Sequence, residues 1–236
     1  MRVAHVLKSL EIGGLGGGAE RFALALSQAL TGRVQAQTLV ICLRTGSAVE
    51  QQWQERAQAG GSEVIYLQDE ARLKPLAGAR AMQAQSGRYA WDIVHAHYQV
   101  GALYACLVKQ ACLVRTVHTP LEWGSGPASV AARAIFSRLI FPLVYRAQVG
   151  VSMGITGALN RTPGARLARR QAVYIPNALP DEWLSAARLN EARQRQHRSE
   201  GSLVVGSVGR LVPNKGYADL ITAFAQVKAA FTGAQL

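Results

Sequence analysis

The sequence predicts an α/β protein whose main domain is a doubly wound, Rossmann-like parallel sheet. Short apolar runs alternate with longer helical patterns from residue 2 to residue 176. The runs are apolar along most of their length, as strands are when helices cover both faces of a parallel sheet. A glycine-rich segment directly follows the first run, where the first βα turn of such folds lies. The chain has 236 residues, 49% of them hydrophobic, which is ample for a buried core.

The expected elements follow this alternation in order. We expect strands at 2–8, 34–43, 62–67, 92–97, 112–118, 147–152 and 172–176, and helices at 19–30, 47–59, 76–86, 99–109, 128–146 and 153–160. Residues 181–200 are highly charged with few large apolar side chains, which indicates a linker helix on the surface. A strand at 202–212 and an amphipathic helix at 215–231 then resume the α/β pattern. These patterns divide the chain into an N-terminal domain (1–180), a charged linker (181–200) and the start of a second Rossmann-like domain (201–236).

Composition narrows the classes of partner. The net charge of +12 attracts phosphates of any kind, whether in nucleotides, anionic lipids or nucleic acids. No basic run is interleaved with aromatic residues, so we expect no nucleic-acid partner. The three cysteines match no zinc or redox spacing and are expected to be reduced core thiols.

The N-terminus and the apolar runs bear on localisation. Lys8 and Glu11 interrupt the first apolar run before a secretory signal can form. Other uncharged runs fall short of the roughly 20 apolar residues of a spanning helix. We therefore expect a cytoplasmic protein that does not cross a membrane.

The expected helix at 128–146 bears on peripheral membrane contact. It mixes Arg133, Arg138 and Arg146 with large apolar side chains, a composition compatible with docking on anionic lipid at the inner face of a membrane. A buried core helix would have much the same composition, so both interpretations stay open.

The glycines between residues 13 and 18 suggest an anion site. Glycines between a strand and a helix let backbone N–H groups approach a phosphate at the positive end of the helix dipole. The dinucleotide-binding fingerprint is incomplete, because Leu15 is not glycine and no acidic residue closes the strand 34–43. A tight turn without a ligand explains the glycines equally well.

Histidines end two of the expected strands. His95 and His97 lie at the carboxyl end of strand 92–97 and point to the same side of the sheet. No nearby carboxylate or cysteine completes a coordination shell, so we expect no metal site there and favour hydrogen-bonded structural roles. His118 ends strand 112–118, where ligands of such sheets bind, and is the better candidate for contact with a reacting group. A core histidine is the alternative for His118 as well.

Two cations lie in the loop between the last expected strand and helix. Arg210 and Lys215 beside a helix N-terminus suit a diphosphate, since arginine offers a bidentate fork and lysine a movable point charge. A solvated basic turn is the alternative.

Six ordered segments together are more specific than any one of them. They are GGGAE (16–20), DIVHAH (92–97), TVHTP (116–120), VGVS (149–152), VYIPNAL (173–179) and VGRLVPNKGYADLITAF (208–224). In this combination the chain resembles the retaining glycosyltransferases of the two-Rossmann-domain GT-B fold, family-4 type.

The resemblance implies an enzyme that transfers a sugar from a nucleotide diphosphate donor, with retention at the anomeric carbon. The N-terminal domain would bind a glycan or lipid-linked acceptor, in cell-envelope or polysaccharide synthesis, and the second domain the nucleotide sugar. Gly17 and Gly18 would approach the donor phosphates, and His118 would contact the sugar. Arg210 and Lys215 would clamp the diphosphate, so that neither a metal nor another cofactor is needed.

Candidate cleft-lining residues by the same resemblance are His95, His97 and Asn177. The family's later E-x7-E segment has no counterpart before Leu236, so we expect a truncated transferase that is inactive alone. Two other classes stay open: a nucleotide-dependent Rossmann oxidoreductase or epimerase, and a non-catalytic basic module associated with a membrane.

Overall fold

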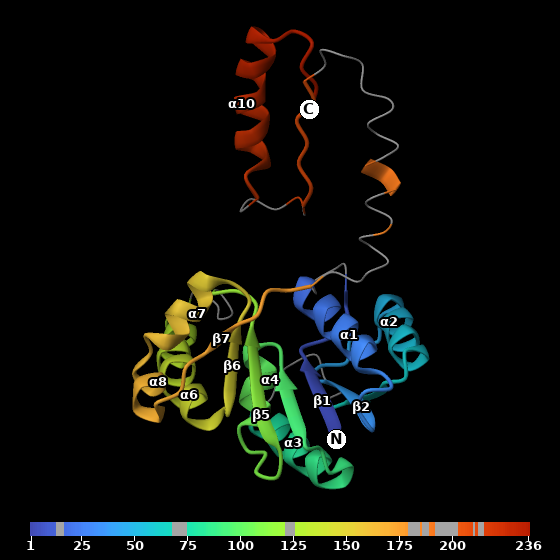
Figure 1. The fold of residues 1–236 in the computed structure, drawn as a ribbon, viewed down its shortest axis with the longest axis vertical. Helices are drawn as coiled ribbons and strands as arrows, with labels where there is room; N and C mark the ends of the chain where they lie inside the picture. Colours follow the sequence, from blue (N-terminus) through green and yellow to red (C-terminus); the bar gives the residue numbers. More distant parts are fainter. Residues whose placement is uncertain are drawn as a thin grey trace. The chain divides into compact units, whose positions relative to one another are not determined.

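The computed structural model divides the chain into two compact units, Met1–Leu179 and Pro180–Leu236 (Figure 1). It describes residues 1–12, 17–67, 75–120, 126–178, 185, 189–191, 203–209, 211 and 215–236. The expected linker at 181–200 thus lies mostly outside the described residues.

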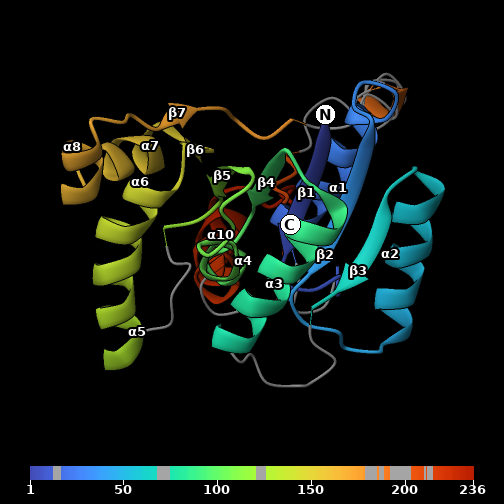
Figure 2. The same ribbon diagram turned by 90° about the horizontal axis from the view of Figure 1, so that it is seen from below.

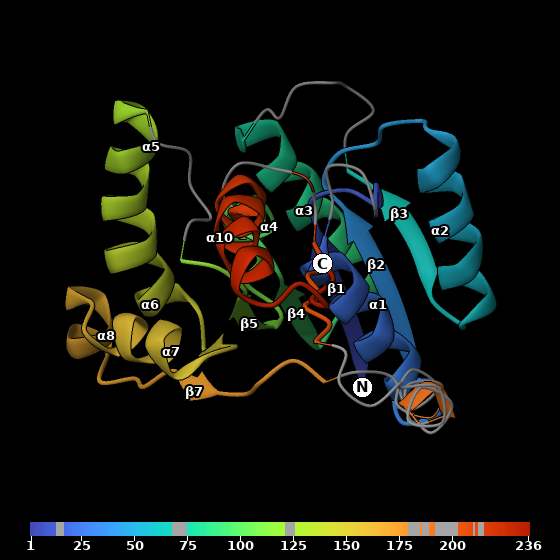
Figure 3. The ribbon, with the colours of Figure 1, turned by 90° about the horizontal axis from the view of Figure 1, so that it is seen from above.

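The first unit is built on one parallel sheet of seven strands. They are β1 (Arg2–Leu7), β2 (Ala36–Ile41), β3 (Glu63–Tyr66), β4 (Ile93–Ala96), β5 (Cys112–Val117), β6 (Ala147–Gly150) and β7 (Val173–Tyr174). Their order across the sheet is β3-β2-β1-β4-β5-β6-β7, and Figure 3 shows β3 to β5 in sequence. The order reverses between β1 and β4, which is the topological switch point of a doubly wound sheet. The predicted fold class is therefore confirmed.

Helices connect the strands and cover both faces. They are α1 (Gly18–Leu30), α2 (Ala48–Ala59), α3 (Pro75–Tyr89), α4 (Gln99–Ala105), α5 (Pro127–Ala132), the π-helix η1 (Arg133–Ile140), α6 (Phe141–Val144), α7 (Met153–Asn160) and α8 (Pro163–Ala168). Ser47, Ser152 and Thr162 cap α2, α7 and α8, each accepting a hydrogen bond from the backbone N–H three residues later. The helix α8 was not expected from the sequence, because it has only six residues, which follow the capping Thr162.

Alternation along the strands creates two cores. Leu7 and Leu39 pack on one face of the sheet with residues of α1 and α2. Val6 and Val40 pack on the other face with residues of α3 and α4, among them Tyr104. Figure 2, seen from below, shows α3 and α4 together on one side of the strands.

Residues 127–144 form one continuous helix from α5, η1 and α6. By length and composition alone it could span a membrane, and only 11% of it is buried. Arg133 and Arg138 lie in its middle, where each arginine costs about 2.5–3.5 kcal/mol on insertion scales. Phe141 and Pro142, by contrast, are buried within the domain. These features favour a helix held on the protein surface over one that spans a bilayer.

In the second unit the longest described helix is α10 (Tyr217–Ala230), and residues 189–191 are also helical. The strand expected at 202–212 is not formed by the described residues of that segment. They make one isolated parallel bridge, Val204 with Gln235. A strand pairs stably only with neighbours that bury its apolar face, and here Val208 and Leu211 are 103% and 87% exposed.

Candidate functional site

Histidines from three adjacent strands meet near the switch point of the sheet. His5 lies in β1 and is the direct register partner of His95 in β4. His97 follows β4 and His118 follows β5. All four project toward the face covered by α1, since the neighbouring residues Val6, Val94 and Ala96 belong to the opposite core.

Three of these imidazoles form a row. His5 Nδ1 lies 3.4 Å from His97 Nε2, and His97 Nδ1 lies 3.4 Å from His118 Nε2. His95 lies beside the row, with its Nε2 2.7 Å from Thr116 Oγ1 and its ring centroid 4.1 Å from that of His97. The ring of Phe22, from α1, packs edge-on against His97 and His118.

Burial keeps these histidines neutral. Desolvation lowers the pKa of His5 to about 4, of His95 to about 3 and of His118 to about 4. The pKa of His97 is held well below its usual value, first by burial and then by the neighbouring imidazoles. At neutral pH each ring therefore has one N–H donor and one acceptor nitrogen, which suits hydrogen bonding but not a positive charge.

The two ring nitrogens of His118 have different surroundings. Its Nε2 faces His97, while its buried Nδ1 has no hydrogen-bond partner among the described residues. A buried polar atom without a partner is costly unless a ligand satisfies it. This observation favours His118 as a substrate contact, the role expected from its strand-end position.

The histidines also bear on metal binding. His5, His95 and His97 each offer a nitrogen within 4.8 Å of the others, which is donor chemistry that zinc accepts. However, each ring nitrogen of His97 lies 3.4 Å from a nitrogen of another imidazole. A metal bound to His97 would have to replace one of these contacts. His5 was not among the expected site residues, because it lies inside an apolar strand. The absence of a metal remains a prediction.

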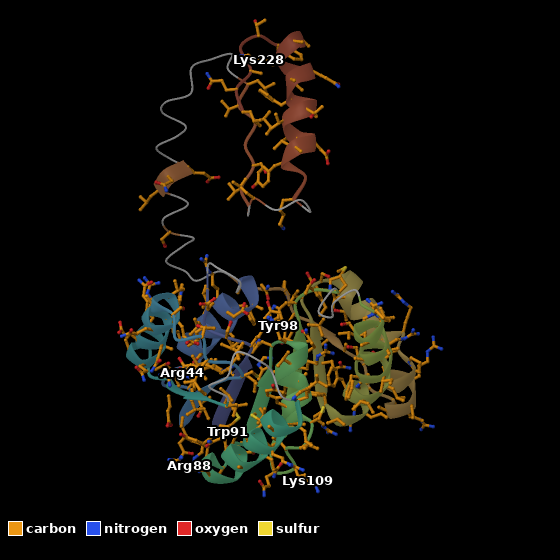
Figure 4. All side chains as sticks on the ribbon, turned by 180° about the vertical axis from the view of Figure 1, so that it is seen from behind. Arg44, Arg88, Trp91, Tyr98, Lys109 and Lys228 are labelled. Carbon is orange, nitrogen blue, oxygen red and sulfur yellow. The ribbon has the colours of Figure 1, made fainter. Side chains whose placement is uncertain are left out.

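The described part of the glycine loop begins α1. Gly17 precedes the helix and donates its N–H to Glu20 Oε2 at 2.9 Å. Glu20 is buried, and burial raises the pKa of its carboxyl group. Tyr98 donates its hydroxyl to the same oxygen at 3.4 Å; Figure 4 shows Tyr98 at the end of the domain opposite Trp91. The spacing of Gly17 and Glu20 is that of a helix cap, a sequence signal that would have identified Glu20.

No described residue packs against the two candidate glycines. A Cβ built on Gly17 or Gly18 would meet nothing within 4 Å among the described residues. Packing therefore does not require glycine at either position. Open space at a helix N-terminus is compatible with the phosphate approach expected of them.

Three sequence-predicted candidates remain, Asn177, Arg210 and Lys215. Asn177 is exposed beyond β7. Lys215 is exposed in the second unit, and Arg210 lies outside the described residues. The diphosphate clamp expected of Arg210 and Lys215 therefore stays a prediction.

A doubly wound sheet with polar side chains gathered beside its switch point is the arrangement of proteins that bind ligands in the crevice there. Residues 16–182 match Glycosyltransferase Family 4. The chain belongs to this family. A search of curated protein sequences found no match.

Three solved structures share the fold. A glycosyltransferase from Rickettsia africae ESF-5 is 14% identical with a TM-score of 0.63, over 97% of this chain and 57% of its own. HepE from Anabaena, in complex with UDP and glucose, is 18% identical with a TM-score of 0.62, over 96% and 58%. Sucrose-phosphate synthase from Thermosynechococcus elongatus is 14% identical with a TM-score of 0.63, over 96% and 60%. The chain therefore spans less than two thirds of the length of each.

Proposed function

We propose that this chain acts in the transfer of a sugar from a nucleotide diphosphate donor to a glycan or lipid-linked acceptor, with retention of the anomeric configuration. The observation that carries the proposal is the family match over residues 16–182. The histidine cluster at the switch point supports it, because the cluster lies where such sheets bind ligands. Family membership favours this class over a Rossmann oxidoreductase or epimerase.

In this proposal the first unit binds the acceptor and the reacting sugar. The neutral His118 directs its unpaired Nδ1 to a sugar hydroxyl or carbonyl, and His97 fixes the orientation of its ring through the contact at Nε2. Arg210 and Lys215 clamp the diphosphate and stabilise the charge that grows on it as the glycosidic bond breaks. No metal is required when two cations perform that task.

The class of donor and the setting are also proposals. The neighbour from Anabaena was solved with UDP and glucose, which supports a nucleotide sugar as the donor here. A glycan or lipid-linked acceptor would place the reaction in cell-envelope or polysaccharide synthesis, in the cytoplasm or at the inner face of the membrane.

The activity test compares two proteins. One is the 236-residue chain, and the other is the same chain with any further in-frame sequence that its gene encodes. Each is mixed with uridine, guanosine and adenosine diphosphate sugars and a cell-envelope acceptor fraction. Release of the nucleotide diphosphate is followed, and the anomeric configuration of the product is read by NMR. Nicotinamide fluorescence is titrated in parallel as the test for an oxidoreductase.

We expect acceptor-dependent release with retention, and its loss by about 10²-fold or more in His118→Ala, the size of effect typical of a lost group in the transition state. Turnover by the 236-residue chain alone would show that no further segment is needed. No turnover by either protein, or saturable nicotinamide binding, would contradict sugar transfer. An inverted product would contradict retention alone.

We also propose peripheral contact of the first unit with an anionic membrane. Along the helix 127–144 the exposed apolar side chains are Val130, Ile135, Leu139, Leu143 and Val144, each 38–53% exposed. Residues 123–180 contain seven arginines and no lysine, aspartate or glutamate. An apolar stripe within a region whose charged side chains are all positive is the pattern of a helix that lies in a membrane interface.

A further inference from the structure

A cavity of about 370 Å³ lies between β5, η1 and α7 in the first unit. Its lining is mostly apolar, with Val117, Ile155 and Leu159 among its residues. Four arginines also line it, and among the described residues no acidic side chain does; the arginines are Arg115, Arg133, Arg138 and Arg161. The sugar-transfer proposal does not use this cavity.

The cavity is distinct from the histidine cluster. Successive residues of a strand point to opposite faces, so Arg115, Val117 and Thr119 share the side of β5 that lines the cavity. Thr116 and His118 point the other way, toward His95 and His97. Arg115 of β5 therefore lies on one side of the sheet, and His118, directly after β5, lies on the other.

Arg115 is a fully buried cation of this cavity, only 1% exposed. Its guanidinium lies 4.5 Å from the centre of the Phe141 ring. Its Nη1 donates to Oε1 of Gln148 at 3.3 Å, and Gln148 is its register partner in β6. These contacts hold the guanidinium in a fixed orientation.

The π geometry of η1 brings two more arginines to the cavity. In an α-helix, residues five apart are separated by about 140° around the axis. In a π-helix the hydrogen bonds join residues five apart, so Arg133 and Arg138 lie one above the other on the same side. Both line the cavity together with Ser137. Arg161, which follows α7, adds a fourth cation from a separate element.

We propose that this cavity binds a phosphate ester, with the guanidinium groups on the phosphate and the apolar wall beside its organic part. Arginine forks match phosphate oxygens in geometry and remain charged at all relevant pH values. The nearest acidic residues in sequence on either side of residues 123–180 are Glu122 and Asp181, so η1, α7 and the turn after it, which carry Arg133, Arg138 and Arg161, contain no carboxylate of their own. Free phosphate esters and lipid headgroups share this chemistry, and the exposed apolar stripe of helix 127–144 favours a lipid.

The test measures binding to the whole chain by calorimetry, without any reference to activity. The probes are glycerol 3-phosphate and dihexanoyl phosphatidic acid below its micelle concentration, with zwitterionic dihexanoyl phosphatidylcholine as the comparison of zero net charge. The variant is Arg133→Gln with Arg138→Gln, two residues that lie outside the buried core. The matched control is Arg146→Gln with Arg166→Gln, which removes the same charge from exposed positions outside the cavity lining.

We expect saturable binding of a phosphate ester by the unmodified chain. Binding should weaken at least about tenfold in the cavity variant, as loss of a charge-assisted hydrogen bond implies, and less than about twofold in the control. A circular dichroism spectrum identical to that of the unmodified chain checks that the variant is folded. Tighter binding of phosphatidic acid than of glycerol 3-phosphate assigns the site to lipid headgroups, and equal binding assigns it to free esters.

Absence of saturable binding, or equal weakening in variant and control, would overturn the proposal, since net charge alone would then explain any attraction. Binding of the phosphatidylcholine probe as tight as that of phosphatidic acid would overturn it too. The outcome is independent of sugar transfer: the cavity can bind phosphate whether or not the extended protein turns over a nucleotide sugar.

Discussion

Single residues determine how the histidine cluster responds to acid. His5, His95 and His118 have pKa values of about 4, 3 and 4 in the folded protein, against about 6.5 when unfolded. Between these values only the unfolded chain takes up protons at these rings, so acid favours unfolding. The stability that the buried, neutral histidines contribute is complete above pH 6.5. It falls as the pH drops toward 4 and changes little below 3.

We therefore expect the free energy of unfolding to fall steeply between pH 6.5 and pH 4. The slope contributed by each histidine is at most about 1.4 kcal/mol per pH unit. Urea titrations at pH 7, 6 and 5 measure it. His95→Gln keeps a hydrogen-bonding group near Thr116 and removes one titrating ring, so its slope should be shallower. Equal unfolding free energies at pH 7 and pH 5 in the unmodified chain would contradict the argument.

At the residue scale, the sequence predicted part of the candidate site. His95, His97 and His118 were found because they end strands, where ligands of such sheets bind. His5 was not, since a lone histidine inside an apolar strand reveals no partner until strand order is known. Register alone places it opposite His95. Arg115 was missed for the same reason, because no local pattern shows that η1 and α7 converge on it.

At the scale of elements, α8 packs closely on η1. A Cβ on Gly164 would lie 2.6 Å from the backbone oxygen of Leu139, and backbone atoms cannot move aside as a side-chain end can. Gly164→Ala should therefore push α8 away and destabilise the protein by about 1–3 kcal/mol.

The matched control is Gly87→Ala in α3, where a Cβ meets nothing within 4 Å among the described residues. It should be neutral or stabilising by up to about 1 kcal/mol, since alanine favours a helix. Urea unfolding midpoints of both variants provide the comparison. A Gly164→Ala protein as stable as Gly87→Ala would show that α8 yields at little cost.

The helix 127–144 gives a second element-scale prediction. The first unit should sediment with vesicles of anionic lipid at low salt and detach as salt rises, because the attraction is screened within about 10 Å at 0.1 M ionic strength. Ile135→Ser with Leu139→Ser, at positions 53% and 40% exposed, should weaken binding while leaving the fold intact. No sedimentation at low salt, or equal sedimentation with neutral vesicles, would contradict an anionic interface.

Elements were predictable where apolar patterning is strong. Each expected strand of the first unit contains an observed strand, although β7 is reduced to Val173–Tyr174. The expected strand at 202–212 is the failure, because an apolar run becomes a strand only beside others. The π-helical geometry of η1 could not be predicted from the sequence either, since its residues suit an ordinary α-helix equally well.

At the scale of the whole molecule, apolar burial is very uneven. Among the described residues, every buried apolar side chain except Ala234 belongs to Met1–Leu179. The helix α10 has no buried residue, and Ile221 on it is 61% exposed. The first unit therefore has a core of its own, and the described part of the second has almost none.

We expect limited proteolysis to cut within residues 180–236 and to leave a resistant fragment close to residues 1–179. That fragment, expressed alone, should unfold at nearly the same urea concentration as the 236-residue chain, because unfolding free energy follows buried area. Mass spectrometry of the digest and a urea titration test this. Early cuts inside the sheet, or failure of the fragment to fold, would show that the second unit supports the first.

The alternating faces of β5 have a consequence for how this protein can evolve. Arg115 and His118 lie three positions apart on one strand, yet they point to opposite sides of the sheet. A substitution that reshapes the arginine side leaves the imidazole side chemically untouched. Selection can therefore change what the cavity binds while the histidines keep their roles. Arg115 and His118 are encoded within a dozen nucleotides, but the alternation of side chains along the chain directs them to separate sites.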